Sequence, residues 1–117
     1  MRAQLKTLAS PDTGDLRGYL PENPHAFALL VRAGIGVEEL EEFEVFEFLV
    51  CTPGWLMDNL RPGDHRLGNH LLITPHYDYE RLVKYLHQFC ARCEGADWFA
   101  IAQKLQALGR WEFEPTR

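Results

Sequence analysis

The chain has 117 residues, is 46% hydrophobic and 25% charged, and carries a formal net charge of -5 with a sequence pI of about 5.5. This length falls within the roughly 100–150 residues of one ordinary domain, so we expect a single domain over residues 1–117. The apolar content excludes a disordered chain. The acidic balance argues against a nucleic-acid partner, because a protein that binds nucleic acid needs a basic face.

The cysteines and the apolar runs bear on the compartment. No apolar run approaches the roughly 18 residues of a membrane span. The first six residues lack a long apolar core, so a signal peptide is not expected. Three cysteines, Cys51, Cys90 and Cys93, form an odd and sparse set that favours reduced thiols over a disulfide framework. We therefore expect a cytoplasmic protein without a membrane partner.

The N-terminal part of the chain predicts two strands. Residues 3–8 alternate in part and suit an opening strand, and residues 10–24 contain the prolines and glycines of a long surface loop. Residues 27–33 form an apolar run typical of a buried strand. The glycines of residues 34–36 are expected to end that strand.

Residues 43–51 carry the clearest strand pattern. Apolar side chains occupy both alternating faces, which predicts a central strand covered on both sides. Together with residues 27–33 this strand is expected to form an antiparallel hairpin.

Helices dominate the remainder of the chain. Thr52 and Pro53 predict the start of a short helix that ends near Leu60, and residues 71–74 predict another strand. Asp78 and Asp97 each precede an amphipathic stripe, so both are expected to cap helices, which end near Gly95 and Gly109. Residues 111–114 could add a last short strand. The predicted fold is α+β: a mostly antiparallel sheet of about four to five strands packed against two C-terminal helices plus one short helix.

No catalytic residue is predicted. Ser10 is the single serine and lies in a proline-rich turn without a nucleophile-elbow pattern. Cys51 closes a buried strand, whereas reactive cysteines need an exposed and electropositive setting. The glycines of residues 34–36 lack the third glycine and the following helix of a phosphate-binding loop.

A metal site is an alternative that the sequence leaves open. Cys90 and Cys93 form a Cys-x-x-Cys pair, and His87 lies three residues before them, but a structural zinc site needs a second pair of ligands. Loop histidines form a second group with two aspartates: Asp64, His65, His70, His76 and Asp78. The alternative function is a small metal-dependent enzyme or metal-binding protein. We favour packing for the two cysteines and no functional role for the loop histidines, and no metal or cofactor is predicted.

One segment stands out by its charge. Residues 33–60 contain no lysine or arginine and seven acidic residues, so this segment carries -7 and the rest of the chain +2. Five of the carboxylates lie in and just behind the predicted hairpin connection, and they are the predicted partner-binding residues: Glu38, Glu39, Glu41, Glu42 and Glu44. Two explanations fit this charge equally well. The segment is either a solvated turn that keeps an edge strand from aggregating or a site that steers a basic protein into place. The spacing does not match a calcium-binding helix–loop–helix.

Several blocks in order along the chain resemble the immunity protein 8 family of bacterial polymorphic toxin systems. These blocks are residues 46–56, 70–73, 77–79, 93–98 and 109–114. The resemblance implies a cytoplasmic α+β protein, not an enzyme, that neutralises a cognate toxin domain by tight stoichiometric occlusion. It supplies no toxin-binding residues. A basic nuclease toxin would fit the acidic residues, and an oligomeric scaffold remains the third function considered, so a homo-oligomer stays open.

Overall fold

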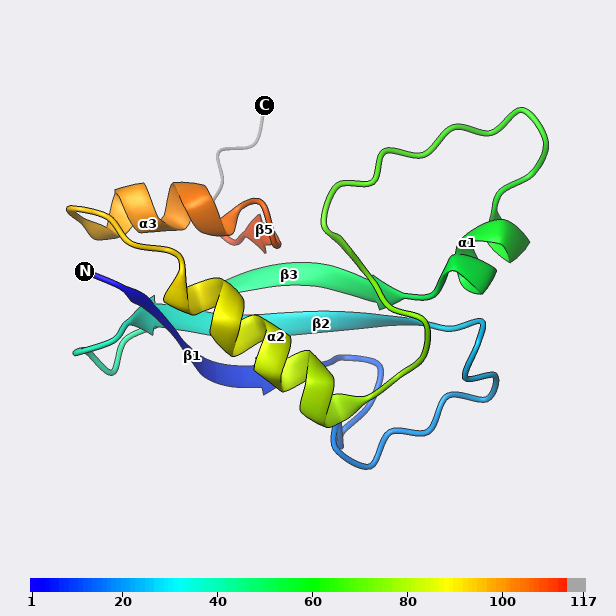
Figure 1. Ribbon diagram of the computed structural model, residues 1–117, viewed down its shortest axis with the longest axis horizontal. Coiled ribbons are helices and arrows are strands. Elements are labelled where there is room, and N and C mark those ends of the chain that lie inside the picture. Colours follow the sequence, from blue (N-terminus) through cyan, green and yellow to red (C-terminus); the bar gives the residue numbers. More distant parts are fainter. Residues whose placement is uncertain (114–117) are drawn as a thin grey trace.

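The computed structural model describes residues 1–113 and contains five strands and three helices (Figure 1). The elements in chain order are β1 (Ala3–Ala9), β2 (Ala28–Val37), β3 (Glu44–Cys51), α1 (Pro53–Asn59), β4 (Leu71–Ile73), α2 (Tyr79–Ala91), α3 (Trp98–Leu105) and β5 (Arg110–Trp111). Glu114, in the predicted last strand, lies outside the described residues; the strand observed there is β5.

All five strands belong to one sheet. The order is β1-β2-β3-β4, with β5 on the same edge of β3 as β4. The pairs β1–β2, β2–β3 and β3–β5 are antiparallel, and β4 is parallel to β3. The parallel pair needs a long crossover, which α1 and residues 60–70 supply. The predicted α+β class and the β2–β3 hairpin are confirmed.

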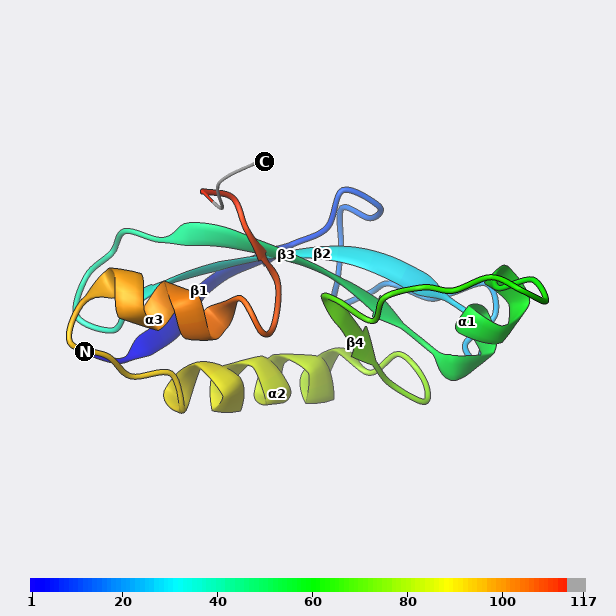
Figure 2. The same ribbon diagram turned by 90° about the horizontal axis from the view of Figure 1, so that it is seen from above.

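Helices α2 and α3 lie on one side of this sheet (Figure 2). Between sheet and helices lies one core of buried side chains, among them Leu29, Ile35, Phe46, Leu86 and Ile101. The hydrophobic effect drives this layering because each element buries its apolar face against the other.

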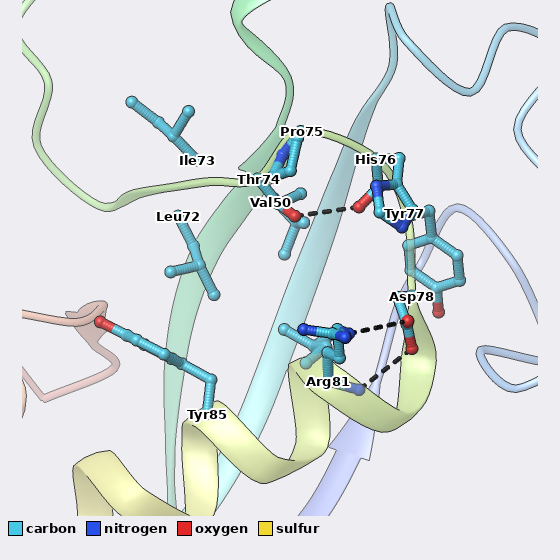
Figure 3. A pocket seen from close by; sticks show the side chains of 11 residues that line it. Val50, Leu72, Ile73, Thr74, Pro75, His76, Tyr77, Asp78, Arg81 and Tyr85 are labelled. Atoms are coloured by element: carbon cyan, nitrogen blue, oxygen red, sulfur yellow. Dashed lines mark hydrogen bonds and ion pairs between the residues drawn. The ribbon is translucent and has the colours of Figure 1, made fainter.

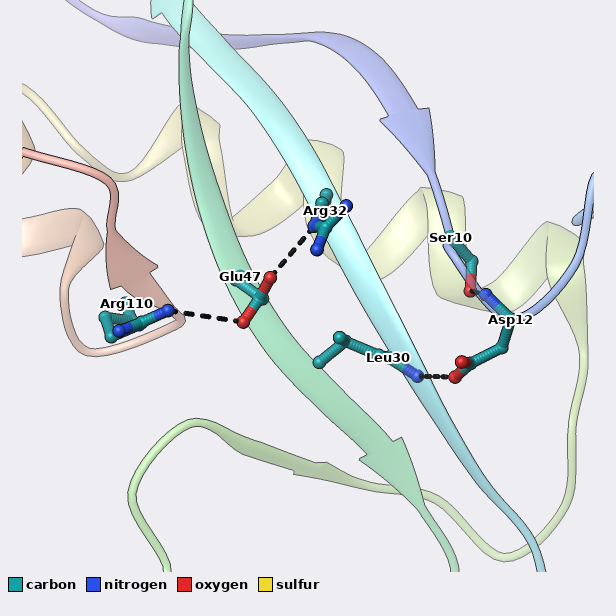
Figure 4. Close-up of polar contacts among 6 residues, drawn as sticks. All are labelled: Ser10, Asp12, Leu30, Arg32, Glu47 and Arg110. Carbon is teal, nitrogen blue, oxygen red and sulfur yellow. Dashed lines mark hydrogen bonds and ion pairs between the residues drawn. The ribbon is translucent and has the colours of Figure 1, made fainter.

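The opposite face of β3 carries no covering helix in the described part of the chain, so the prediction that β3 is covered on both sides was wrong. Its side chains Val45, Glu47 and Leu49 are only half-buried. The carboxylate of Glu47 accepts a hydrogen bond from Arg32 Nε at 2.9 Å and lies 3.6 Å from Arg110 (Figure 4). A charged side chain at the centre of this face keeps the face hydrated.

Strand β2 continues through the glycines that were expected to end it. Residues 34–36 all pair with β1, and residues 34 and 35 also pair with β3. A Cβ on Gly34 would lie 2.1 Å from Thr7 Oγ1, and a Cβ on Gly36 would lie 2.0 Å from the Glu42 carbonyl oxygen. These glycines therefore mark close approach of neighbouring segments within a strand, not a turn.

The predicted helix caps are confirmed. Thr52 Oγ1 accepts from Trp55 N at 3.2 Å, Asp78 from Arg81 N at 3.1 Å, and Asp97 from Ala100 N at 2.8 Å. Each bond satisfies an N–H that has no partner inside its helix. Helix α2 ends at Ala91 and α3 at Leu105, before the glycines that were predicted to stop them.

Candidate protein-binding site

The connection between β2 and β3, residues 38–42, forms an acidic loop at one end of the sheet. Glu38, Glu39, Glu41 and Glu42 are all exposed, and none makes an ion pair with another residue of the described range 1–113. Lys6 Nζ contacts this loop only through the main-chain oxygen of Glu38, at 3.3 Å. Four neighbouring carboxylates therefore face solvent without an ion-pair partner among residues 1–113.

Main-chain contacts hold the acidic loop in place. Glu38 N donates to the Arg2 carbonyl at 2.9 Å, and Leu40 N donates to the Val37 carbonyl at 3.0 Å. The missing side chain of Gly36 leaves space for the Glu42 carbonyl. The loop thus presents its carboxylates from a fixed backbone at the end of two paired strands.

Apolar side chains accompany the acidic ones. Leu40 is 53% exposed and Phe43 is 45% exposed. Both line a shallow pocket of about 180 Å³, together with Gly36, Val37, Glu42, Glu44 and Trp98. An apolar centre inside a charged rim is the usual anatomy of a protein–protein interface.

Glu44, the fifth predicted partner-binding residue, lies in a different environment. It is half-buried, and its Oε1 accepts hydrogen bonds from Trp98 Nε1 at 2.5 Å and Trp111 Nε1 at 2.9 Å. This carboxylate is therefore engaged within the chain, whereas the other four are free. No local pattern could reveal these bonds, because the tryptophans follow Glu44 by 54 and 67 residues.

The three cysteines are buried, and Cys90 and Cys93 belong to the core between the sheet and the helices. Burial, reinforced by the neighbouring Cys93 thiol, raises the pKa of Cys90 to about 12, and burial also raises the pKa of Cys51 and of Cys93. Such thiols stay protonated at neutral pH, and the thiolate is the form that attacks substrates and binds metals. This environment fits the packing role predicted for them.

The histidines do not converge. His70 closes the loop before β4 in a left-handed conformation, with φ of 58°, and its Nε2 lies 3.0 Å from the Gln106 carbonyl. His65 and His76 are exposed on loops. Within residues 1–113, no group of three or more histidine, cysteine or acidic side chains is placed to hold a metal ion.

A larger cavity of about 280 Å³ opens between β4 and α2 (Figure 3). Several of its polar groups have partners: Asp78 caps α2 and lies 3.4 Å from Arg81 Nε, and Thr74 Oγ1 donates to the His76 carbonyl at 2.9 Å. Tyr77 donates its hydroxyl to the Leu16 carbonyl, and burial raises its pKa to about 12. The phenol is therefore neutral at physiological pH, and the cavity is a mainly apolar depression.

The fold is that of a small α+β protein with an exposed acidic loop at one end of its sheet. The chain belongs to the immunity protein 8 family, whose model matches residues 3–115. This membership gives the chain the role of an immunity protein, whose partner is a toxin. No curated protein and no solved structure matches the chain. None of the helices described is long and apolar enough to cross a membrane.

Proposed function

We propose that this protein binds a cognate toxin domain in the cytoplasm and neutralises it by stoichiometric occlusion, with the acidic loop placed against a basic surface of the toxin. Four exposed carboxylates without an ion-pair partner in the described chain, in a member of an immunity family, carry this proposal. The whole of residues 1–117 would act as a single domain.

Electrostatics explains what such a loop would contribute. Like charges held close together are unfavourable in the free protein, and an oppositely charged surface relieves this repulsion. The resulting field steers diffusional encounter and mainly raises the association rate constant. A nuclease toxin is the class that fits best, because its substrate groove binds phosphates and is therefore basic.

Isothermal titration against the toxin domain encoded beside the gene tests the function. One-to-one binding with a dissociation constant in the nanomolar range, about -12 kcal/mol, is expected. Loss of the toxin's activity at one equivalent should accompany binding. A folded toxin that gives neither heat nor inhibition would contradict the proposal.

Stopped-flow association kinetics test the surface. Glu39→Gln/Glu41→Gln removes two charges from the acidic loop and should lower the association rate constant about threefold or more at low salt. Glu22→Gln/Asp58→Asn changes the net charge equally at exposed positions on another loop and on α1. Equal rate constants for the two double variants would assign the acidic loop no part in encounter.

A further inference from the structure

Three aromatic side chains, contributed by α3 and by the chain at β5, form a cluster on the surface. Phe99 is 61% exposed, Phe113 is 60% exposed, and the half-buried ring of Trp111 lies between them. The ring centroid of Trp111 is 6.3 Å from that of Phe99 and 6.2 Å from that of Phe113. We call Phe99, Trp111 and Phe113 the aromatic cluster.

The aromatic cluster is fixed from below. Trp111 stacks on the buried Phe46 ring with an interplanar angle of 9°, and its Nε1 donates to Glu44. The Glu112 carboxylate accepts from Val45 N at 2.8 Å, which ties the chain just before Phe113 to β3. The exposed rings therefore stand on an ordered base and lose little conformational freedom when a partner covers them.

The aromatic cluster is linked to the acidic loop through Glu44 and Trp98. Glu44 bonds both Trp111 and Trp98, and Trp98 lines the shallow pocket that also contains Leu40 and Phe43. Through Glu44, the aromatic cluster is therefore linked to a pocket that includes side chains of the acidic loop. Helix α3 and the β2–β3 connection lie toward the same end of the molecule (Figure 1). Single exposed apolar residues such as Leu20 and Leu67 need no explanation, but a contiguous aromatic surface rimmed by charge marks an interaction site.

We infer that the aromatic cluster is the anchor of the toxin interface and receives an arginine-bearing part of the toxin's basic surface. This inference rests on the proposed function. Arginine suits both features, because its guanidinium stacks on aromatic rings and its charge is attracted by the acidic loop. The two parts then divide the work: the acidic loop sets how fast the complex forms, and the aromatic cluster sets how long it lasts.

Surface plasmon resonance with the full chain and the toxin domain encoded beside its gene separates these contributions. Phe99→Ala/Phe113→Ala should raise the dissociation rate constant about tenfold or more and leave the association rate constant within about twofold. Leu20→Ala/Leu67→Ala is the matched control, because it truncates two large apolar side chains that are 87% and 81% exposed. Far-UV circular dichroism and thermal unfolding of each variant confirm that the fold is kept.

The outcomes are distinct. A rise in the dissociation rate constant for the phenylalanine variant alone supports the anchor. If the phenylalanine variant dissociates at the wild-type rate while the Glu39→Gln/Glu41→Gln variant associates more slowly, the anchor is overturned and the proposed function stands. If the wild-type chain itself does not bind the toxin, the proposed function fails and the anchor fails with it.

Discussion

The carboxylate of Glu44 is bound by two indole N–H groups that come from α3 and β5. A half-buried carboxylate needs such donors because it has lost part of its hydration. Glu44 therefore joins β3, α3 and β5, and it lies between the acidic loop and the aromatic cluster. Its charge serves the fold, whereas the charges of the four exposed glutamates are available to a partner.

Substitution of Glu44 should separate these two roles. Glu44→Ala leaves both indole N–H groups without an acceptor and should lower the free energy of unfolding by roughly 2–3 kcal/mol. Glu44→Gln keeps a carbonyl acceptor and should cost about 1 kcal/mol. Urea unfolding followed by circular dichroism measures both values. Glu41→Ala, at an exposed position in the acidic loop, should stay within about 0.5 kcal/mol of the wild type; a loss equal to that of Glu44→Ala would refute this division.

At the scale of elements, the β2–β3 connection depends on the close approach of Gly36 to the Glu42 main chain. Because the obstructing atom is a carbonyl oxygen at 2.0 Å from the added Cβ, Gly36→Ala must displace the acidic loop. The free energy of unfolding should fall by roughly 1–3 kcal/mol, the usual cost of overpacking. Gly68→Ala is the control, since nothing lies within 4 Å of its added Cβ. Urea titration of both variants provides the measurement, and equal midpoints would show that the loop yields freely.

Sequence patterns predicted the elements well where the cause is local. The Thr52, Asp78 and Asp97 caps depend on a side chain and an N–H three residues apart, so the sequence reveals them. The apolar stripe of α2 follows in the same way from helical spacing, with Leu82, Leu86 and Cys90 buried.

Features that depend on distant partners were not predictable. The parallel pairing of β4 with β3, the extension of β2 through its glycines and the open face of β3 all depend on segments far away in the chain. In the candidate site, the charge of the acidic loop was evident from composition, but its link through Glu44 and Trp98 to the aromatic cluster was not. Phe99 lies next to the inward-facing stripe of α3, and only its 61% exposure in the folded chain shows that it faces solvent.

At the scale of the whole molecule, one continuous core joins the sheet to α2 and α3. We therefore propose that the chain unfolds as one cooperative unit, as small single domains usually do. In a Trp55→Phe variant, tryptophan fluorescence reports only on Trp98 in α3 and Trp111 in β5, two elements that lie away from α1 (Figure 1). Its urea midpoint should coincide with the midpoint from far-UV circular dichroism. Two separated midpoints would show that parts of the chain unfold independently.

The net charge is unevenly distributed over the molecule. Residues 33–60 carry -7 and the remaining chain +2, and the free carboxylates of the acidic loop gather at one end of a body 44 Å long. Such an asymmetric distribution orients an approaching basic protein before contact is made.

The two indoles that share the Glu44 carboxylate give the protein a built-in optical probe. Trp98 and Trp111 both donate to Glu44, and Trp111 belongs to the aromatic cluster, while Trp55 in α1 lies under the Arg66 guanidinium. A ligand seated on the aromatic cluster would strip water from the first pair and shift their emission to shorter wavelength, with Trp55 unchanged as an internal reference. Complex formation could then be followed on the unlabelled protein, in real time and at the concentrations that a tight inhibitor requires.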